Sequence, residues 1–418
     1  MTTRKRLQIA VVAVAALALT ACGGGFDDGG EAGTSAPNTT PTDKTVQVLI
    51  GSSGQAETDA VTSAVTAWSE ESGIPAEVVV ASDLAQQLSQ GFAGGDPADL
   101  FYMSADQLNT FAANGSVLAY GDNLANKDSF YPSLVSAFTV KDKFYCAPKD
   151  FSTLALVIND RLWAEAGLTD ADYPKTWEDL AAVSQKLTSD DVVGLAFGPE
   201  LQRVGVFMAQ AGGSFVSEDG TQATLSSEEN VEALTYVKDN LAAGNFAFSS
   251  DLGAGWGGEA FGKEMAAMVI EGNWITGAMK ADFPDVAYTV VELPRGPKGQ
   301  GTIQYTNCWG IAADADNTAG AQQLAEFLTT PERQMDFAKA FGVMPSVQSA
   351  QADWMAEYPA MGAFIAGASY AVDLPSFQGS ADVIADFNAQ LASLKTTDPK
   401  ALLDSVNASL QAAIDSAK

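Results

Sequence analysis

Short β-rich runs alternate with helical patterns at the start of the folded part of this 418-residue chain. The run Val46–Ile50 is followed by a turn and then by apolar residues on one helical stripe, at Val61, Ala64, Val65 and Trp68. Gly73 predicts the end of that helix, and residues 77–80 predict a second strand. A strand, a helix and a strand in this order predict a parallel pair, so the alternation indicates an α/β fold.

The same alternation continues and predicts a second α/β lobe. Further strand candidates are residues 99–103, 152–158, 192–197, 265–270, 286–291 and 302–311. Thr176 with Asp179, and Ser226 with Glu229, resemble capping boxes, which predict that helices begin there. Helical patterns dominate from Thr318 to the end. Because 418 residues exceed one ordinary core, we expect lobes of about 100 to 200 residues each.

The N-terminus carries a targeting signal. Basic residues at 4–6 precede an apolar run at 7–18, which is too short to cross a bilayer and is typical of a signal peptide, residues 1–21. The motif Leu19-Thr-Ala-Cys22 resembles the lipobox of bacterial lipoproteins, in which the cysteine is acylated and becomes the new N-terminus. The alternative is a plain signal peptide with an incidental cysteine at position 22.

The stretch that follows is expected to be a tether. Residues 22–43 are rich in Gly, Asp, Ser, Thr and Pro, which cannot bury apolar surface, so the folded part begins near Lys44. We therefore expect a protein anchored to the cell membrane on its extracytoplasmic face, through the N-terminal lipid alone. That compartment permits disulfides, and on the residues alone Cys146 and Cys308 could equally be bonded or be two buried thiols.

Charge and composition exclude several classes of function. The 52 acidic residues outnumber the 22 basic ones for a net charge of -30, a field that repels nucleic acid. There is no histidine, which excludes Ser-His-Asp and Cys-His nucleophile systems and the usual His-bearing metal sites. We expect no metal and no cofactor. Chemistry that uses only carboxylates is not excluded.

Several segments carry family patterns in a fixed order. The first pattern is Pro-x-Asp before an apolar strand, in residues 95–102, and the second is Pro-x-Asp in residues 144–159, a segment that ends on Asn. The third is Phe-Gly-Lys in residues 261–274, a segment that ends on Gly-x-Trp. Three shorter segments complete the order, at residues 307–312, 331–334 and 344–346. This series resembles extracellular solute-binding proteins of ATP-binding cassette importers, in the carbohydrate group related to maltose-binding protein. Asn307 and Cys308 depart from it, because relatives commonly carry glycines there.

The resemblance implies a type II periplasmic-binding-protein fold, with two α/β lobes joined by crossing hinge strands and a ligand cleft between them. It places lobe 1 at 44–150 plus 309–355, and lobe 2 at 151–308 plus 356–418. It also puts the segments of Cys146 and Cys308 side by side as hinge strands, so these two would form a disulfide. The implied function is a monomeric receptor, not an enzyme, that delivers its ligand to the permease subunits of an importer.

A sugar site needs carboxylates or amides for hydroxyls and aromatic rings for the C–H faces. On this resemblance Asp150 accepts hydroxyls from the hinge, and Trp274 stacks on a sugar ring. Their alternatives are a surface or hinge-bonded carboxylate and an ordinary half-buried core tryptophan. Further candidates are Asp106, Met103, Glu200, Gln55, Asp83, Trp256 and Asn307. Met103 could instead be packing, Glu200 and Asp106 solvated helix charges, and Trp256 a packed helix entry.

Two other functions compete with a receptor for a mono- or oligosaccharide. An anchored glycoside hydrolase would need two carboxylates about 5 or 9 Å apart across one glycosidic bond. A surface adhesion lipoprotein would need a large exposed apolar patch. Lys263, Lys280 and Lys298 form no cluster along the sequence, which favours a neutral sugar over a phosphorylated one.

Overall fold

The computed structural model describes residues 40–52, 54–217, 219–377 and 379–417. Residues 37–418 form one compact unit, which is the part discussed below. The predicted signal peptide, Cys22 and all but the end of the tether lie outside the described residues. In the described part of the chain, no helix combines the length and apolar character needed to cross a membrane.

A ten-stranded mixed sheet runs through the molecule in the order β2-β1-β3-β11-β6-β9-β7-β8, with β10 on β6 and β12 on β11. Its strands are β1 (Val46–Ile50), β2 (Ala76–Val80), β3 (Leu100–Ser104), β6 (Ala147–Asn159), β7 (Val193–Phe197), β8 (Phe246–Phe248), β9 (Ala266–Gly272), β10 (Tyr288–Val291), β11 (Thr302–Ile311) and β12 (Ala371–Val372). The pair β4 (Thr139–Val140) and β5 (Lys143–Phe144) forms a separate hairpin.

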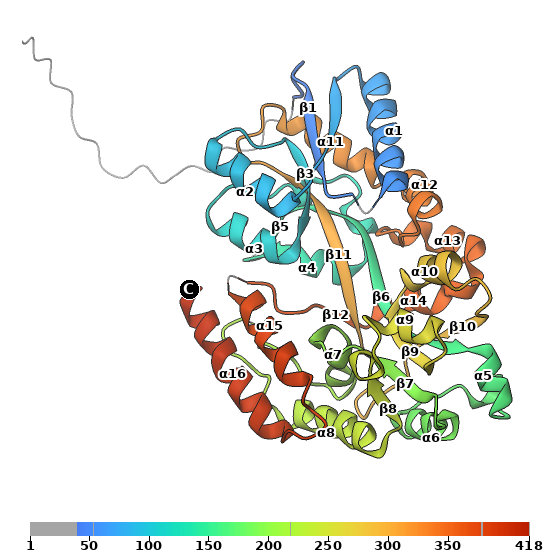
Figure 1. Ribbon diagram of the computed structural model, residues 1–418. Coiled ribbons are helices and arrows are strands. Elements are labelled where there is room, and N and C mark those ends of the chain that lie inside the picture. Colours follow the sequence, from blue (N-terminus) through green and yellow to red (C-terminus); the bar gives the residue numbers. More distant parts are fainter. Residues whose placement is uncertain (1–39, 53, 218, 378, 418) are drawn as a thin grey trace, which may run out of the picture. The chain divides into compact units, whose positions relative to one another are not determined.

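Helices pack against the sheet in both of its halves (Figure 1). They are α1 (Gln55–Ser72), α2 (Leu84–Gly94), α3 (Ala105–Ala113), α4 (Pro132–Ala137), α5 (Asp160–Glu165), α6 (Trp177–Leu187), α7 (Leu201–Gln210), α8 (Glu228–Ala243), α9 (Gly257–Gly262), α10 (Ile275–Asp282), α11 (Thr318–Leu328), α12 (Pro331–Phe341), α13 (Gln351–Glu357), α14 (Gly362–Ala366), α15 (Ser380–Leu391) and α16 (Pro399–Ser416).

Two long strands connect the halves of the sheet, and Figure 1 shows them side by side through its centre. Strand β11 pairs antiparallel with β3 at one end and with β6 along its middle, while β6 pairs with β9 at its far end. All thirteen residues of β6 are buried. The register of β6 and β11 shifts between Asn307 and Cys308. These crossing strands confirm the predicted two-lobed α/β fold with a hinge.

The hydrophobic cores follow the two halves of the sheet. One core surrounds β1 and β3 under α1 and α11, and the predicted stripe of α1 is buried in it. Another surrounds β7 and β8 under α6, α7, α8 and α16. A third lies between β6, β9 and the helices α9, α13 and α14, and includes residues from both predicted lobes. The predicted lobe boundaries therefore stay a prediction.

Local signals placed several element ends correctly, whereas most predicted strands are shifted by one or more residues at one end or both. Gly73 adopts a left-handed conformation, with φ of 74°, and ends α1. The Thr176 hydroxyl accepts the N–H of Asp179 at the start of α6, as predicted. The Ser226 prediction was wrong by one residue: the side chain of Ser227 caps α8. The C-terminal region also contains the short strand β12, which pairs with β11.

The structure brings Cys146 and Cys308 together in the core that surrounds β1 and β3, with their Cα atoms 5.8 Å apart. Cys146 directly precedes β6, and Cys308 lies on β11 at the register shift. Both side chains are buried. This Cα separation lies in the range of known disulfides, so a bond between the two cysteines is sterically possible.

Candidate functional site

A cavity of about 340 Å³ lies beside the two hinge strands. Its walls come from the residues after β1 and β9, from the first half of β6 and the middle of β11, from α1 and β3, and from the end of α12 with the residues after it. The lining residues are Gly51, Glu57, Tyr102, Lys149, Asp150, Phe151, Ser152, Asn273, Trp274, Tyr305, Thr306, Asn307, Phe341, Gly342 and Val343. This size and mixture of aromatic and polar groups are typical of small-molecule sites at domain interfaces.

A buried charge cluster forms the lobe 1 wall of the cavity. The Nζ atom of Lys149 lies 3.4 Å from Oε1 of Glu57 and forms an ion pair with Asp150. The Tyr102 hydroxyl donates a hydrogen bond of 3.0 Å to Glu57, and Lys149 lies 4.3 Å above the Tyr102 ring centre. Burial raises the pKa of Asp150, and Lys149 opposes that rise. One cation therefore holds two carboxylates at the cavity wall.

A second cluster stands on the lobe 2 side. Arg203 forms ion pairs with Glu271 at 2.7 Å and with Glu200 at 3.4 Å. Its guanidinium lies 5.4 Å from the ring centre of Trp274, whose indole N–H donates to Glu271 at 3.0 Å. The ring of Tyr305 meets Trp274 edge-on at 5.2 Å. Burial raises the pKa of Glu271, and Arg203 opposes that rise.

Three of the residues predicted from the sequence line this cavity. Asp150, Trp274 and Asn307 come from β6, the end of β9 and β11, and the structure brings them to one place. Trp274 is 38% exposed, which fits both a stacking platform and a half-buried core tryptophan, so its stacking role stays a prediction. Glu200 directly precedes α7 without a capping hydrogen bond from its side chain, and it reaches the site through its ion pair with Arg203.

Three more predicted residues stand at helix starts and serve local roles there. Asp83 caps α2 by accepting the N–H of Gln86. Asp106 accepts a hydrogen bond from Ser104, and Gln55, the first residue of α1, donates to an acid one turn later. All three predicted residues are exposed, and none is among the described residues that line the 340 Å³ cavity. Their role in binding stays a prediction.

The positions of the last two candidates favour packing. Met103 is only 1% exposed and belongs to the lobe 1 core, because β3 is buried on both faces. Trp256 is half-buried against the third core, and its ring covers Gly258: an ideal Cβ there would lie 2.1 Å from the indole. These positions support the alternative that each side chain fills space.

Sequence reasoning missed the charged partners of the site. Lys149 forms ion pairs with Asp150 and Glu57. Glu271 accepts the indole N–H of Trp274, and Arg203 pairs with Glu271 and lies beside the ring. Lys149 and Glu271 lie inside the segments that carry the family resemblance. A charged residue close in sequence to a predicted site residue was therefore a signal that could have identified both. For Glu57, in the first turn of α1 ahead of its apolar stripe, no local signal existed.

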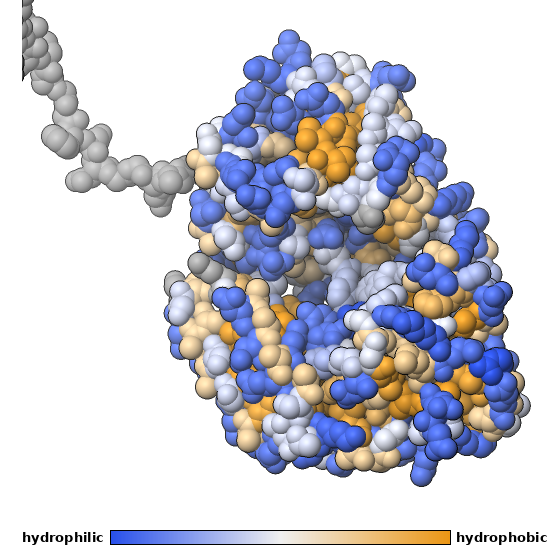
Figure 2. Space-filling model, in the orientation of Figure 1, coloured by the Kyte–Doolittle hydropathy of each residue, from blue (hydrophilic) through white to orange (hydrophobic). Residues whose placement is uncertain are grey.

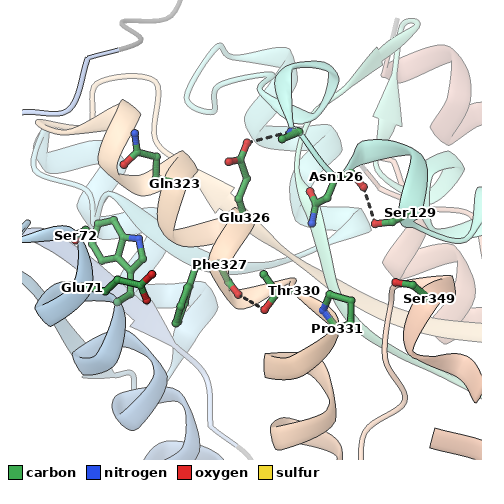
Figure 3. Close-up of a pocket in the computed structure, with 12 residues that line it drawn as sticks. Glu71, Ser72, Asn126, Ser129, Gln323, Glu326, Phe327, Thr330, Pro331 and Ser349 are labelled. Atoms are coloured by element: carbon green, nitrogen blue, oxygen red, sulfur yellow. Dashed lines mark hydrogen bonds between the residues drawn. The ribbon is translucent and has the colours of Figure 1, made fainter. Parts of the chain in front are cut away.

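Two larger cavities lie elsewhere. One of about 780 Å³ separates α3 and α4 from the segments 213–221 and 372–377 and the end of α16, and Figure 2 shows the hollow on this face. The other, of about 580 Å³, lies between α1, α11 and the start of α12 (Figure 3). Its lining includes the apolar side chains of Trp68 and Phe327 and the carboxylates of Glu71 and Glu326. Neither contains a residue of the charge clusters described above.

Comparison with known proteins agrees with this geometry. The family described as bacterial extracellular solute-binding protein matches residues 63–363. The chain is 24% identical to the diacetylchitobiose binding protein DasA of Streptomyces coelicolor, over 84% of each chain.

Solved structures share the fold. A cyclo/maltodextrin-binding protein complexed with maltotetraose is 22% identical with a TM-score of 0.79, over 92% of this chain and 100% of that one. The sugar-binding protein MalE from Xanthomonas citri is 16% identical with a TM-score of 0.80, over 89% and 98%. The fold, the cleft at the hinge and the family match over most of the sequence agree, and the chain belongs to the bacterial extracellular solute-binding proteins.

Proposed function

We propose that this protein is a receptor that captures a mono- or oligosaccharide in the cleft between its lobes and delivers it to the permease subunits of an ABC importer. The observation that carries the proposal is the cavity at the hinge, which combines the carboxylate of Asp150 and the amide of Asn307 with the exposed ring of Trp274. Such groups suit the hydroxyl edges and the C–H faces of sugars. The diacetylchitobiose binding protein and the cyclo/maltodextrin-binding protein to which the chain is similar support the same class of ligand.

The proposal assigns no chemistry to the site. A glycoside hydrolase needs one carboxyl group free to donate a proton and a second one facing it. Here Asp150 and Glu57 stand on the same wall and share Lys149, and Glu271 is engaged by Arg203. Because Lys149 and Arg203 are already paired, the site suits a neutral sugar better than a phosphorylated one.

A thermal-shift screen tests the function. The soluble protein from Lys44 onward is mixed with a panel of neutral mono- and oligosaccharides, including chito- and malto-oligosaccharides. A ligand at 100 times its dissociation constant stabilises the folded state by about 2.7 kcal/mol, so a cognate sugar is expected to raise the melting temperature clearly. If no sugar of the panel, from either oligosaccharide series or from the monosaccharides, changes the melting temperature, the result would count against a sugar receptor.

Substitutions in the cavity separate its two kinds of contact. Trp274→Ala removes a ring face, and Asp150→Asn removes charge-assisted hydrogen bonds worth about 1.5 to 3 kcal/mol, so roughly ten- to a hundredfold weaker binding is expected for the latter. Calorimetric titration with the best sugar of the panel measures both. Melting curves without ligand are the control. Normal affinity with a lowered melting temperature would end the assignment of Trp274 as a stacking platform.

We also propose that Cys22 carries the lipid that anchors the receptor, with residues 22–43 as its tether. The basis is the lipobox-like motif at the end of the signal peptide. Cys22→Ser is expected to abolish incorporation of labelled palmitate and to release the protein from the membrane fraction. Labelling that persists in this variant would refute the proposal.

The remaining proposals concern organisation. We propose that the receptor acts as a monomer, that its lobes divide at the two hinge strands as the sequence predicted, and that Cys146 and Cys308 are bonded in the exported protein. Their proximity across the hinge strands supports the bond.

A further inference from the structure

We propose that Glu271, together with Arg203 and Gly272, positions the indole of Trp274 so that the ring is held ready before any ligand arrives. This inference rests on the proposed function, in which Trp274 stacks on a sugar ring. None of the three positioning residues is among those that line the cavity. They act through Trp274 and not through the ligand.

Glu271 fixes the polar edge of the ring. Its Oε2 accepts the indole N–H of Trp274 at 3.0 Å and also accepts a guanidinium N–H of Arg203 at 2.7 Å. Glu271 is only 1% exposed, whereas the indole that it holds is 38% exposed. A buried acceptor that is itself fixed by an ion pair leaves the ring little freedom to turn about its side-chain bonds.

Gly272 makes room for the apolar side of the ring. An ideal Cβ at this position would lie 2.2 Å from Cζ3 of Trp274, so the benzene part of the indole occupies the space that any side chain would need. Gly272 ends β9, where its backbone conformation is not one that requires glycine. The glycine is therefore explained by the ring above it.

Two further groups close the remaining sides. The guanidinium of Arg203 lies 5.4 Å from the indole centre, at cation–π distance. The ring of Tyr305 meets the indole at 88° and is itself fixed, because its hydroxyl donates to the carbonyl of Gln202 at 2.9 Å. The exposed part of the Trp274 ring is therefore held in one orientation before a ligand binds.

A preorganised ring avoids the entropy cost of ordering it on binding. Freezing one rotamer-rich side chain at an interface corresponds to roughly a two- to tenfold change in affinity. Loss of the Glu271 contact should therefore weaken sugar binding by about that factor, less than loss of the ring itself. The effect would be larger if the freed ring also collapsed into the cavity.

The test reads the ring directly. The protein is labelled with 5-fluorotryptophan, and the fluorine resonance of Trp274, one of seven tryptophans, is assigned by its disappearance in Trp274→Phe. Glu271→Ala is expected to move this resonance toward that of the free amino acid, while Glu271→Gln, which keeps an acceptor, should move it less. Glu165→Gln is the matched control, since it also removes a carboxylate from an arginine ion pair, with Arg161, but does not touch the ring.

The outcomes separate the inference from the proposed function. Gly272→Ala tests the same ring from its apolar side, and should also shift the Trp274 resonance, even if Glu271→Ala does not fold. A Trp274 resonance that stays in place in a folded Glu271→Ala variant, or in Gly272→Ala, overturns the positioning role. Failure of the sugar panel would overturn the receptor function instead, and the fluorine spectra would still decide whether the ring is positioned.

Discussion

Replacing Cys146 and Cys308 together by alanine is expected to lower the free energy of unfolding by roughly 5 kcal/mol. The two residues are 162 apart in the sequence, and the chain-entropy model assigns this amount to closing so long a loop in the unfolded state. Alanine is used in place of serine because it leaves no buried hydroxyl at either site. Denaturant titration of the variant beside the parent protein measures the difference.

The bond should first be demonstrated chemically. Mass spectrometry of the exported protein without reduction is expected to find one peptide pair joined through Cys146 and Cys308. Reduction of the parent protein should reproduce the instability of the double variant, which serves as an internal control. Two thiols that alkylate without prior reduction would contradict the bond, and an unchanged midpoint in the double variant would contradict its energetic role.

A disulfide at this place would restrict how the hinge strands move relative to each other. It joins the residue before β6 to the point where the register of β6 and β11 shifts. Sliding of one hinge strand past the other is then limited, whereas rotation of the lobes about the strands farther along is not. We expect the bond to narrow the range of motion of the hinge without preventing closure.

The backbone of this fold was largely predictable from the sequence. Strands β1 and β11 have the predicted bounds, because runs of β-branched and aromatic residues bounded by glycine define them locally. The cap of α6 was equally local. Strand β6 proved longer than its predicted 152–158 and includes Asp150, since a hinge strand shared by both lobes is buried along its whole length.

The site was predictable only in part. Asp150 and Trp274 were found because their segments resemble a family, but their partners depend on contacts between distant segments. Glu57 lies 92 residues from Lys149, and Arg203 lies 68 residues from Glu271. Pairings of this kind follow from sheet order and side-chain direction, which no local pattern contains.

Removing the charge of Lys149 is expected to destabilise the fold as strongly as loss of a core side chain. Its Nζ atom is the cation between Glu57 and Asp150, and its side chain is only 8% exposed. Lys149→Met keeps the apolar stem but leaves two buried carboxylates without that cation. Breaking a buried ion pair in this way costs about 3 to 5 kcal/mol at neutral pH.

The loss should depend on pH in a definite direction. Burial already raises the pKa of Asp150, and Lys149 is the group that opposes the rise, so the variant has a still higher folded-state pKa. When the folded pKa lies above the unfolded value of about 3.9, the folded state binds the extra proton. Stability is then greatest below that unfolded value and falls as the pH increases through the folded pKa. The deficit of the variant should grow between pH 4 and pH 8.

Denaturant titrations at both pH values measure this deficit. The control is Lys400→Met, which breaks an exposed ion pair with Asp404 on α16 and should cost less than about 1 kcal/mol at either pH. Adding Asp150→Asn to Lys149→Met should restore part of the stability at pH 8, because it removes one of the two carboxylate charges that face the lost cation. A deficit that is independent of pH and is not relieved by Asp150→Asn would mean that Lys149 contributes through packing against Tyr102 and Phe341 instead of through its charge.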